Sequence, residues 1–389
     1  MELLNQSTSF MPTAISTTPK KRAGNESVAY LTSHHVLHPA PSMRRPAKQS
    51  QGSGLPTLEL ALDQVAMTSC LRARLCSVAL ATHELKLINI ELLDCKPSKR
   101  ALIRYELANA ETGECYTVLG KLYADSTQLA RVHQVMDRLW TDVFAGDIYC
   151  SVPQPLGVLP ELSMLLYLPA EGQFLDEVLT GEQAAYAMEL TGRWLATLHN
   201  TPLPLTKQFH LSGELTNLAA WADIVGQTYP ELAMLAQQAL HYLHQQATRL
   251  PLATQTPIHK DFHYRHVLVE RGIKVIDFDE LRLGDPNFDL AHFCANLHLL
   301  AYRRYGSPHA MRTLEQRFFA AYARNMQWAL TGDQSAQFTY FYVYTCLKLA
   351  RQLCLGFGPS PIPTAEERRS QVYVVLNQAS VAIRAANKL

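Results

Sequence analysis

The chain has 389 residues, of which 48% are hydrophobic and 18% charged, a composition typical of a folded globular protein. Its formal net charge of +1 lacks the basic excess that proteins binding nucleic acid usually show. No apolar run approaches the roughly 18 residues of a membrane-spanning helix, so we expect neither a nucleic-acid nor a membrane partner.

The eight cysteines are scattered, with no Cys-x-x-Cys pair. In a chain of this size the pattern favours reduced thiols over a disulfide or zinc framework. The N-terminal residues lack the hydrophobic segment of a secretory signal. The sequence therefore predicts a cytoplasmic protein.

Residues 1–55 are rich in Ser, Thr, Pro, Gly and Gln and lack apolar periodicity, which predicts a flexible leader. A run of apolar residues from Leu58 to Leu71 then predicts one helix. The segment 85–125 has the alternation and turns of strands, and 127–144 has a helical period. Two more strands are expected at 152–158 and 162–168.

The remaining chain reads as helical apart from one short hairpin. We expect helices at 184–199, 215–225, 232–247, 290–304, 311–330, 338–354 and 365–387. This order predicts an N-terminal lobe over 56–168 and a C-terminal lobe over 169–389.

Two carboxylates flank the hairpin, and they form the most informative part of the sequence. Asp261 precedes the first apolar strand, 267–269, and Asp277 follows the second, 274–276; a turn at 271–272 joins the strands. Phosphoryl-transfer enzymes place a base and a metal ligand in this way. The first carboxylate can accept the proton of an attacking hydroxyl, and the second can hold Mg²⁺ on the nucleotide phosphates.

These motifs resemble the aminoglycoside phosphotransferase and choline kinase branch of the protein-kinase-like fold. His259-Lys260-Asp261 matches the start of the family's His-x-Asp-x-x-x-x-Asn catalytic loop, and the family's Gly-Asp-Pro-x-x-Asp-Leu-Ala segment is complete at 284–291. The resemblance implies a two-lobed α+β fold with a small antiparallel β-rich lobe and a mainly helical lobe. It also implies transfer of a phosphate from ATP or GTP, with Mg²⁺, to a hydroxyl of a small molecule.

The resemblance assigns roles to individual residues. Asp261 would be the catalytic base, His259 would support the loop, and Lys260 would offset charge near the transferred phosphate. Asp277 would bind Mg²⁺, and Asp279 would bind a second metal or cap the turn. Asp289, within the Gly-Asp-Pro segment, would accept backbone N–H groups of the catalytic loop.

The nucleotide would lie against the first lobe. Lys121, the only lysine inside an apolar strand there, would contact the phosphates. The same sequence pattern would also arise if Lys121 lay on an edge strand and reached the solvent. Backbone groups of the interlobe connector at 166–170, including Leu166 and Leu168, would hydrogen-bond the adenine edge.

The chain departs from the family pattern at three places. His266 stands where the family has a metal-holding Asn, and imidazole is a softer ligand than Mg²⁺ prefers. No Gly-rich loop precedes Lys121, so Lys99 or Arg100 would have to cover the phosphates. The helix at 127–144 has only Asp137 and Asp142 as candidate acidic partners for Lys121.

Two alternatives follow from these departures. The fold can serve as a non-catalytic nucleotide-binding protein or scaffold, a pseudokinase. A metal hydrolase built on His259, Asp261, His263 and His266 would explain the histidines but not the hairpin or the Gly-Asp-Pro segment.

The sequence says least about the acceptor molecule. From Leu297 onward basic side chains outnumber acidic ones, which disfavours a polycationic acceptor. A neutral or anionic hydroxylated metabolite fits better.

Overall fold

The computed structural model describes residues 54–75, 85–110, 113–250, 254–326, 334–357 and 363–388. Of the predicted leader, 1–55, all but the last two residues lie outside this part of the chain. The end of the helix predicted at 311–330 also lies outside it.

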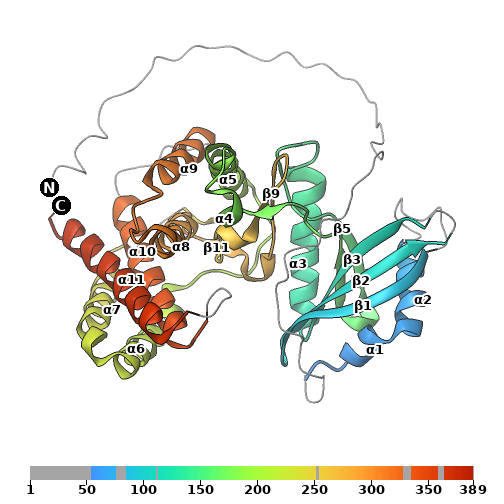
Figure 1. Ribbon diagram of the computed structural model, residues 1–389, viewed down its shortest axis with the longest axis horizontal. Coiled ribbons are helices and arrows are strands. Elements are labelled where there is room, and N and C mark those ends of the chain that lie inside the picture. The colour runs from blue at the N-terminus through green and yellow to red at the C-terminus, as the bar shows by residue number, and fades with distance from the viewer. Residues whose placement is uncertain are drawn as a thin grey trace, which may run out of the picture. The chain divides into compact units, whose positions relative to one another are not determined.

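The first lobe is built on a five-stranded antiparallel sheet in the order β1-β2-β3-β6-β5 (Figure 1). Its strands are β1 (Leu85–Lys96), β2 (Arg100–Asn109), β3 (Cys115–Tyr123), β5 (Pro155–Leu159) and β6 (Met164–Tyr167). The predicted antiparallel sheet around Lys121 is confirmed.

The two faces of this sheet pack against different helices, because successive side chains of a strand point to opposite faces. Leu122 of β3 is buried in the core that α1 (Leu58–Leu62) and α2 (Gln64–Leu75) share with the sheet. Tyr123, the next residue, is buried in the core that contains the apolar face of α3 (Ser126–Arg138). Lys121 therefore points to the α3 face, where the sheet meets the catalytic hairpin.

The single helix predicted from Leu58 is in fact two. Asp63 adopts an extended backbone, and its carboxylate accepts the Ala66 N–H at 2.7 Å. A side chain that caps the following turn competes with continuation of the preceding helix. The helix predicted at 127–144 is confirmed as α3, which continues into a π-helical turn, η1 (Leu139–Val143).

The second lobe is mainly helical, as predicted. Its helices are α4 (Leu175–Val178), α5 (Ala184–Asn200), α6 (Leu211–Thr228), α7 (Ala233–Ala247), α8 (Asn287–Tyr305), α9 (Arg312–Asn325), α10 (Gln334–Cys354) and α11 (Ala365–Ala386). No helix in the described ranges is long and apolar enough to cross a membrane.

The predicted hairpin is present as β9 (Val267–Val269) and β10 (Ile273–Val275). β7 (Gln173–Phe174) and β4 (Cys150–Ser151) pair with its outer edges. At the hairpin turn, a Cβ on Gly272 would lie 2.4 Å from the Tyr149 carbonyl oxygen, so only glycine permits this approach. A separate pair, β8 (Thr256–Ile258) and β11 (Arg282–Gly284), brackets the catalytic loop and the segment after the hairpin.

Candidate active site

The catalytic loop, residues 259–266, is anchored by Asp289 at the start of α8. Asp289 Oδ2 accepts the His259 N–H at 2.6 Å, and Oδ1 accepts the Lys260 N–H at 2.8 Å. The carboxylate is fully buried, and His199 Nε2 lies 3.2 Å from Oδ2. The predicted role of Asp289 is confirmed in its contacts, because it satisfies two backbone donors that would otherwise be buried without partners.

His259 is buried, and its side chain connects the loop to the end of the hairpin. Its Nε2 lies 3.0 Å from the carbonyl oxygen of Ile276, the residue before Asp277. The ring is enclosed by Trp194, Phe262 and Phe278. The contacts agree with the predicted supporting role, since a fully buried ring can act on a substrate only through the loop it holds.

Lys121 joins the two lobes. Its ammonium lies 2.8 Å from Asp277 Oδ1 and 2.8 Å from Asp279 Oδ1, and only 9% of its side chain is exposed. Arg100 Nη1 reaches Asp279 Oδ2 at 2.8 Å and Asp277 Oδ1 at 3.4 Å. Burial raises the pKa of Asp277, but the charges of Lys121 and its other cationic neighbours lower that pKa by more.

The acidic partner of Lys121 thus comes from the hairpin and not from the helix after β3. Asp137 and Asp142, which the sequence offered for this role, are exposed. α3 instead contributes Arg131, whose Nη2 donates to the Asp279 carbonyl oxygen at 3.1 Å. Tyr123 also donates to Asp279 Oδ1 at 2.8 Å, so Asp279 is held by several groups at once.

Asp261 is surrounded by nitrogen groups from α8, α10 and its own loop. Lys348 Nζ and His292 Nε2 each lie 3.3 Å from Oδ1, and His263 Nε2 lies 3.9 Å from Oδ2. Burial raises the pKa of Asp261, but Lys348 and His292 outweigh it and hold the pKa well below its usual range. The carboxylate is therefore held in its ionised form, which can accept a hydrogen bond from a hydroxyl. Sequence reasoning assigned no contact to Lys348 or His292.

His266 lies between Asp261, the candidate base, and Asp277, the candidate metal ligand. Its Nδ1 lies 2.7 Å from the Asp261 carbonyl oxygen, which can only accept, so Nδ1 carries the hydrogen. In the neutral ring the lone pair is then on Nε2, which lies 3.8 Å from Asp277 Oδ2. Two atoms that share an octahedral ion at about 2.1 Å each lie roughly 3 to 4 Å apart. The pair therefore fits a common divalent cation.

The three groups Asp261, His263 and His266 lie close enough together to suggest a metal cluster. His263 Nδ1, however, accepts the Arg265 N–H at 3.1 Å, so Nδ1 holds its lone pair there and the hydrogen of the neutral ring is on Nε2. The nitrogen that faces Asp261 is therefore not a ligand atom in this arrangement. This geometry speaks against the metal-hydrolase alternative.

The side chain of Lys260 points toward α6. Its ammonium lies 2.6 Å from Glu214 Oε1 on α6 and 5.2 Å from the centre of the Phe209 ring. Its backbone has a positive φ of 67° and Asp277 one of 68°, conformations that non-glycine residues adopt only when the surrounding structure enforces them.

The connector begins within the sheet. Leu166 lies in β6, paired with both β3 and β5, and is fully buried. The Leu168 N–H donates to the Gln154 carbonyl oxygen at 2.9 Å. The N–H of Leu168 is therefore already bonded within the protein.

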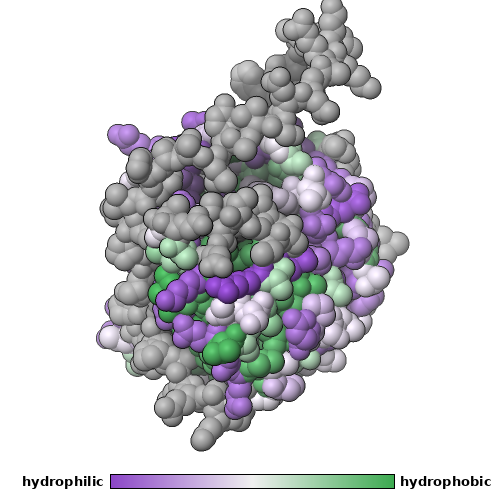
Figure 2. Space-filling view, turned by 90° about the vertical axis from the view of Figure 1, so that its right-hand side faces the viewer, coloured by the Kyte–Doolittle hydropathy of each residue, from purple (hydrophilic) through white to green (hydrophobic). Residues whose placement is uncertain are grey.

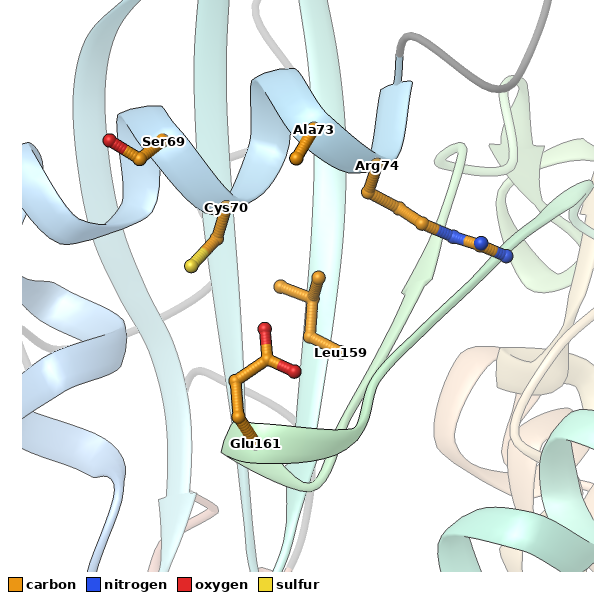
Figure 3. Close-up of a pocket in the computed structure, with 6 residues that line it drawn as sticks. All are labelled: Ser69, Cys70, Ala73, Arg74, Leu159 and Glu161. Atoms are coloured by element: carbon orange, nitrogen blue, oxygen red, sulfur yellow. The ribbon is translucent and has the colours of Figure 1, made fainter.

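A hollow lies on the α2 face of the sheet (Figure 3). Four of its residues come from α2 and two from the end of β5 and the turn that follows: Ser69, Cys70, Ala73, Arg74, Leu159 and Glu161. Figure 2 shows the molecule from the side on which α1 and α2 lie in Figure 1, and hydrophobic and hydrophilic residues are mixed on this face. Since this hollow is on the α2 face and Lys121 is on the α3 face, it is not part of the candidate active site.

Comparisons with known proteins identify the family. Residues 110–333 match the model of the phosphotransferase enzyme family, and this match covers β3, β5 and β6 of the sheet, the loop at 259–266, the hairpin and α8. Since more than half of the chain matches, the protein belongs to this family. No curated protein sequence matches it significantly.

Solved structures show the same fold. A spectinomycin phosphotransferase in complex with ADP and spectinomycin aligns with a TM-score of 0.54 at 13% identity, over 81% of this chain and 98% of that one. A choline kinase from Cryptosporidium parvum aligns with a TM-score of 0.54 at 13% identity, over 83% and 97%. An ethanolamine kinase from Plasmodium vivax aligns at 0.51 and 10% identity, over 80% and 88%. The two-lobed kinase-like fold is confirmed, and the identities are too low to transfer a substrate.

Proposed function

We propose that the protein transfers the terminal phosphate of ATP or GTP to a hydroxyl of a small molecule, with Asp261 as the base. The observation that supports this most directly is the link from Asp261 through His266 to Asp277 and on to Lys121. A base, a metal-ligand candidate and a phosphate-binding cation are thereby held in one continuous set of contacts.

In the proposed reaction the acceptor hydroxyl donates a hydrogen bond to Asp261. Its oxygen attacks the terminal phosphorus, the bond from that phosphorus to the bridging oxygen breaks, and the nucleoside diphosphate leaves. The hydroxyl proton passes to Asp261. Positioning and charge compensation supply most of the rate in such a reaction.

The nucleotide phosphates would contact Lys121 and Arg100. Arg100 is the first residue of β2 and follows the turn at the place where the family has a Gly-rich loop. Its guanidinium also reaches Asp279. Arg100 is therefore a better candidate than Lys99 for covering the phosphates. The connector around Leu166 and Leu168 would lie beside the base, with its contacts made by residues after Leu168.

Asp277, Asp279 and the Nε2 of His266 are the groups that would hold Mg²⁺. When bound, the ion would neutralise charge on the leaving phosphates. Asp277 and Asp279 would then exchange their present contacts with Lys121 and Arg100 for the ion, which would free both cations for phosphate oxygens. Lys260 would act at a distance, through its pair with Glu214.

A cytoplasmic location stays a prediction from the sequence.

Replacement of Asp261 tests catalysis against the pseudokinase alternative. Asp261→Asn should keep nucleotide binding, because Lys121 and Asp277 are untouched, and should lower phosphate transfer or nucleotide hydrolysis by about 100-fold or more. Nucleotide binding by calorimetry and nucleoside diphosphate release are the two measurements. Asp223→Asn, at an exposed carboxylate of α6, is the control. An unchanged rate in Asp261→Asn would instead support a non-catalytic scaffold.

A further inference from the structure

One face of α10 presents a cation to the proposed catalytic base and carries a second cation one turn further along. The helix carries two charged side chains, Lys348 and Arg351, and both are positive. Lys348 lies 3.3 Å from Asp261 Oδ1. Tyr344, Lys348 and Arg351 follow the spacing i, i+4, i+7, which places them along one stripe of the helix.

This stripe faces α6. The Tyr344 ring lies 5.4 Å from the Trp221 ring, and the Arg351 guanidinium lies 5.8 Å from the centre of the same ring. The Nε of Arg351 is buried and has no hydrogen-bond partner within the part of the chain that is described. A buried guanidinium donor without a partner is costly, and an anion would satisfy it.

The carboxylate that α6 supplies on this side is already neutralised. Glu214 accepts from Lys260 at 2.6 Å and from the Tyr344 hydroxyl at 2.5 Å. A cationic acceptor would have to displace these bonds or compete for Asp261 itself, which the reaction needs as the base. An anionic acceptor instead meets the ammonium of Lys348, and the unsatisfied Nε–H of Arg351 lies one helical turn further along the same stripe.

We propose that the acceptor is a small alcohol bearing a phosphate or carboxylate group, which Lys348 and Arg351 bind. This inference rests on the proposed function and specifies its acceptor. Because Lys348 contacts the carboxylate that would accept the hydroxyl hydrogen bond, the anionic group of the acceptor lies close to the attacked hydroxyl. When the acceptor binds, Lys348 leaves its contact with Asp261 and pairs with the anionic group of the acceptor. Asp261 is then free to accept a hydrogen bond from the hydroxyl.

The test is binding measured without nucleotide, so that its result does not depend on phosphate transfer. Glycerol 3-phosphate, glycerate, glycerol and choline are titrated at constant ionic strength by calorimetry. We expect the two anions to bind, and glycerol and choline to bind at least tenfold more weakly. The anion affinity should fall at least tenfold in Lys348→Met and in Arg351→Met, and should recover in Lys348→Arg. Lys86→Met, at an exposed lysine of β1, should not change it.

Three results would overturn the inference: choline binding more tightly than the anions, no anion binding at all, or anion affinity unchanged in both Lys348→Met and Arg351→Met. Loss of anion binding in Lys121→Ala but not in Lys348→Met would place the anion at the nucleotide site and also overturn it. If anions bind as expected but Asp261→Asn leaves transfer unchanged, the proposed function fails and the anion site remains.

Discussion

The ammonium of Lys121 lies 2.8 Å from the carboxylate of Asp277, although 156 residues separate them in sequence. Lys121 lies in β3, the middle strand of the sheet in the first lobe, and Asp277 follows the hairpin of the second lobe. The contact fixes the phosphate-binding candidate beside the metal-ligand candidate. It also supplies the counter-charge that a lysine inside an apolar strand requires.

Substitution of this lysine should weaken the nucleotide site. In Lys121→Ala, nucleotide binding or turnover should fall by at least about tenfold, which corresponds to roughly 1.4 kcal/mol. Calorimetric titration with ATP and GTP, together with a folding check by circular dichroism, measures this. Lys86→Ala on β1 is the matched control, because that lysine is exposed. A folded Lys121→Ala protein with unchanged affinity and turnover would remove Lys121 from the site.

Sequence reasoning found the parts of the site that are close together along the chain. The loop, hairpin and Gly-Asp-Pro segment lie within one stretch, 259–291, and their spacing is set by local backbone geometry. Lys121 was found because a charged residue in an apolar strand needs a partner. Its true partners, Asp277 and Asp279, could not be read from the sequence, since strand and hairpin meet only through packing of the two lobes.

Lys348 was missed because its neighbours in the sequence do not reveal its surroundings. Leu347 and Leu349 are buried, but adjacent residues of a helix point in different directions, so their burial does not imply that Lys348 needs a partner. Helical periodicity alone placed it on a basic, solvent-facing surface. Its contact with Asp261, 87 residues away, depends on how α10 packs beside the catalytic loop. The strands β7, β8 and β11 were missed because two or three residues are too few to show a period.

His266 should alter the choice of metal. Imidazole favours Mn²⁺ over Mg²⁺ relative to an amide oxygen, because Mg²⁺ prefers hard oxygen ligands. His266→Asn should therefore shift the ratio of Mn²⁺ to Mg²⁺ affinity toward Mg²⁺ by about tenfold, or 1.4 kcal/mol. Metal binding is measured directly, by Mn²⁺ electron paramagnetic resonance with Mg²⁺ as competitor, in the presence of a non-hydrolysable nucleotide.

His241→Asn on α7 is the control for this experiment, since that histidine is exposed. If the affinity ratio is the same in wild type and His266→Asn, the imidazole is structural. Its hydrogen bond to the Asp261 carbonyl oxygen would then be its main contribution.

Asp289 should matter for stability as well as for activity. Asp289→Ala leaves the N–H groups of His259 and Lys260 buried without an acceptor, and each unsatisfied group costs about 1 to 3 kcal/mol. Urea unfolding should show a large loss of unfolding free energy, with loss of transfer activity even under conditions where the variant is folded. Asp223→Ala should change neither. An Asp289→Ala variant as stable as wild type would show that the catalytic loop finds other partners.

Folding stability should fall as the pH drops below neutrality, because three histidines, two of them buried and one partly buried, have lowered pKa values. Burial is the largest cause of the lowered pKa of His259, His263 and His292. An unfolded histidine has a pKa of about 6.5, and these three have a lower pKa in the folded chain. Between the two pKa values the unfolded chain binds more protons than the native one. The stability that comes from the neutral histidines is therefore fully present above pH ~6.5 and is lost as the pH falls toward the folded pKa. For His292, Lys348 adds to the lowering, while Asp261 opposes it.

The melting temperature, measured from pH 8 to pH 5, should therefore decline below about pH 6.5. His292→Asn removes one of the three titrating groups and should make the decline shallower, whatever its effect on the melting temperature at pH 8. His241→Asn, which removes an exposed imidazole, should leave the slope as in wild type. A slope that does not respond to His292→Asn would mean that this imidazole takes up its proton equally in the folded and unfolded chains, in conflict with its burial beside Lys348.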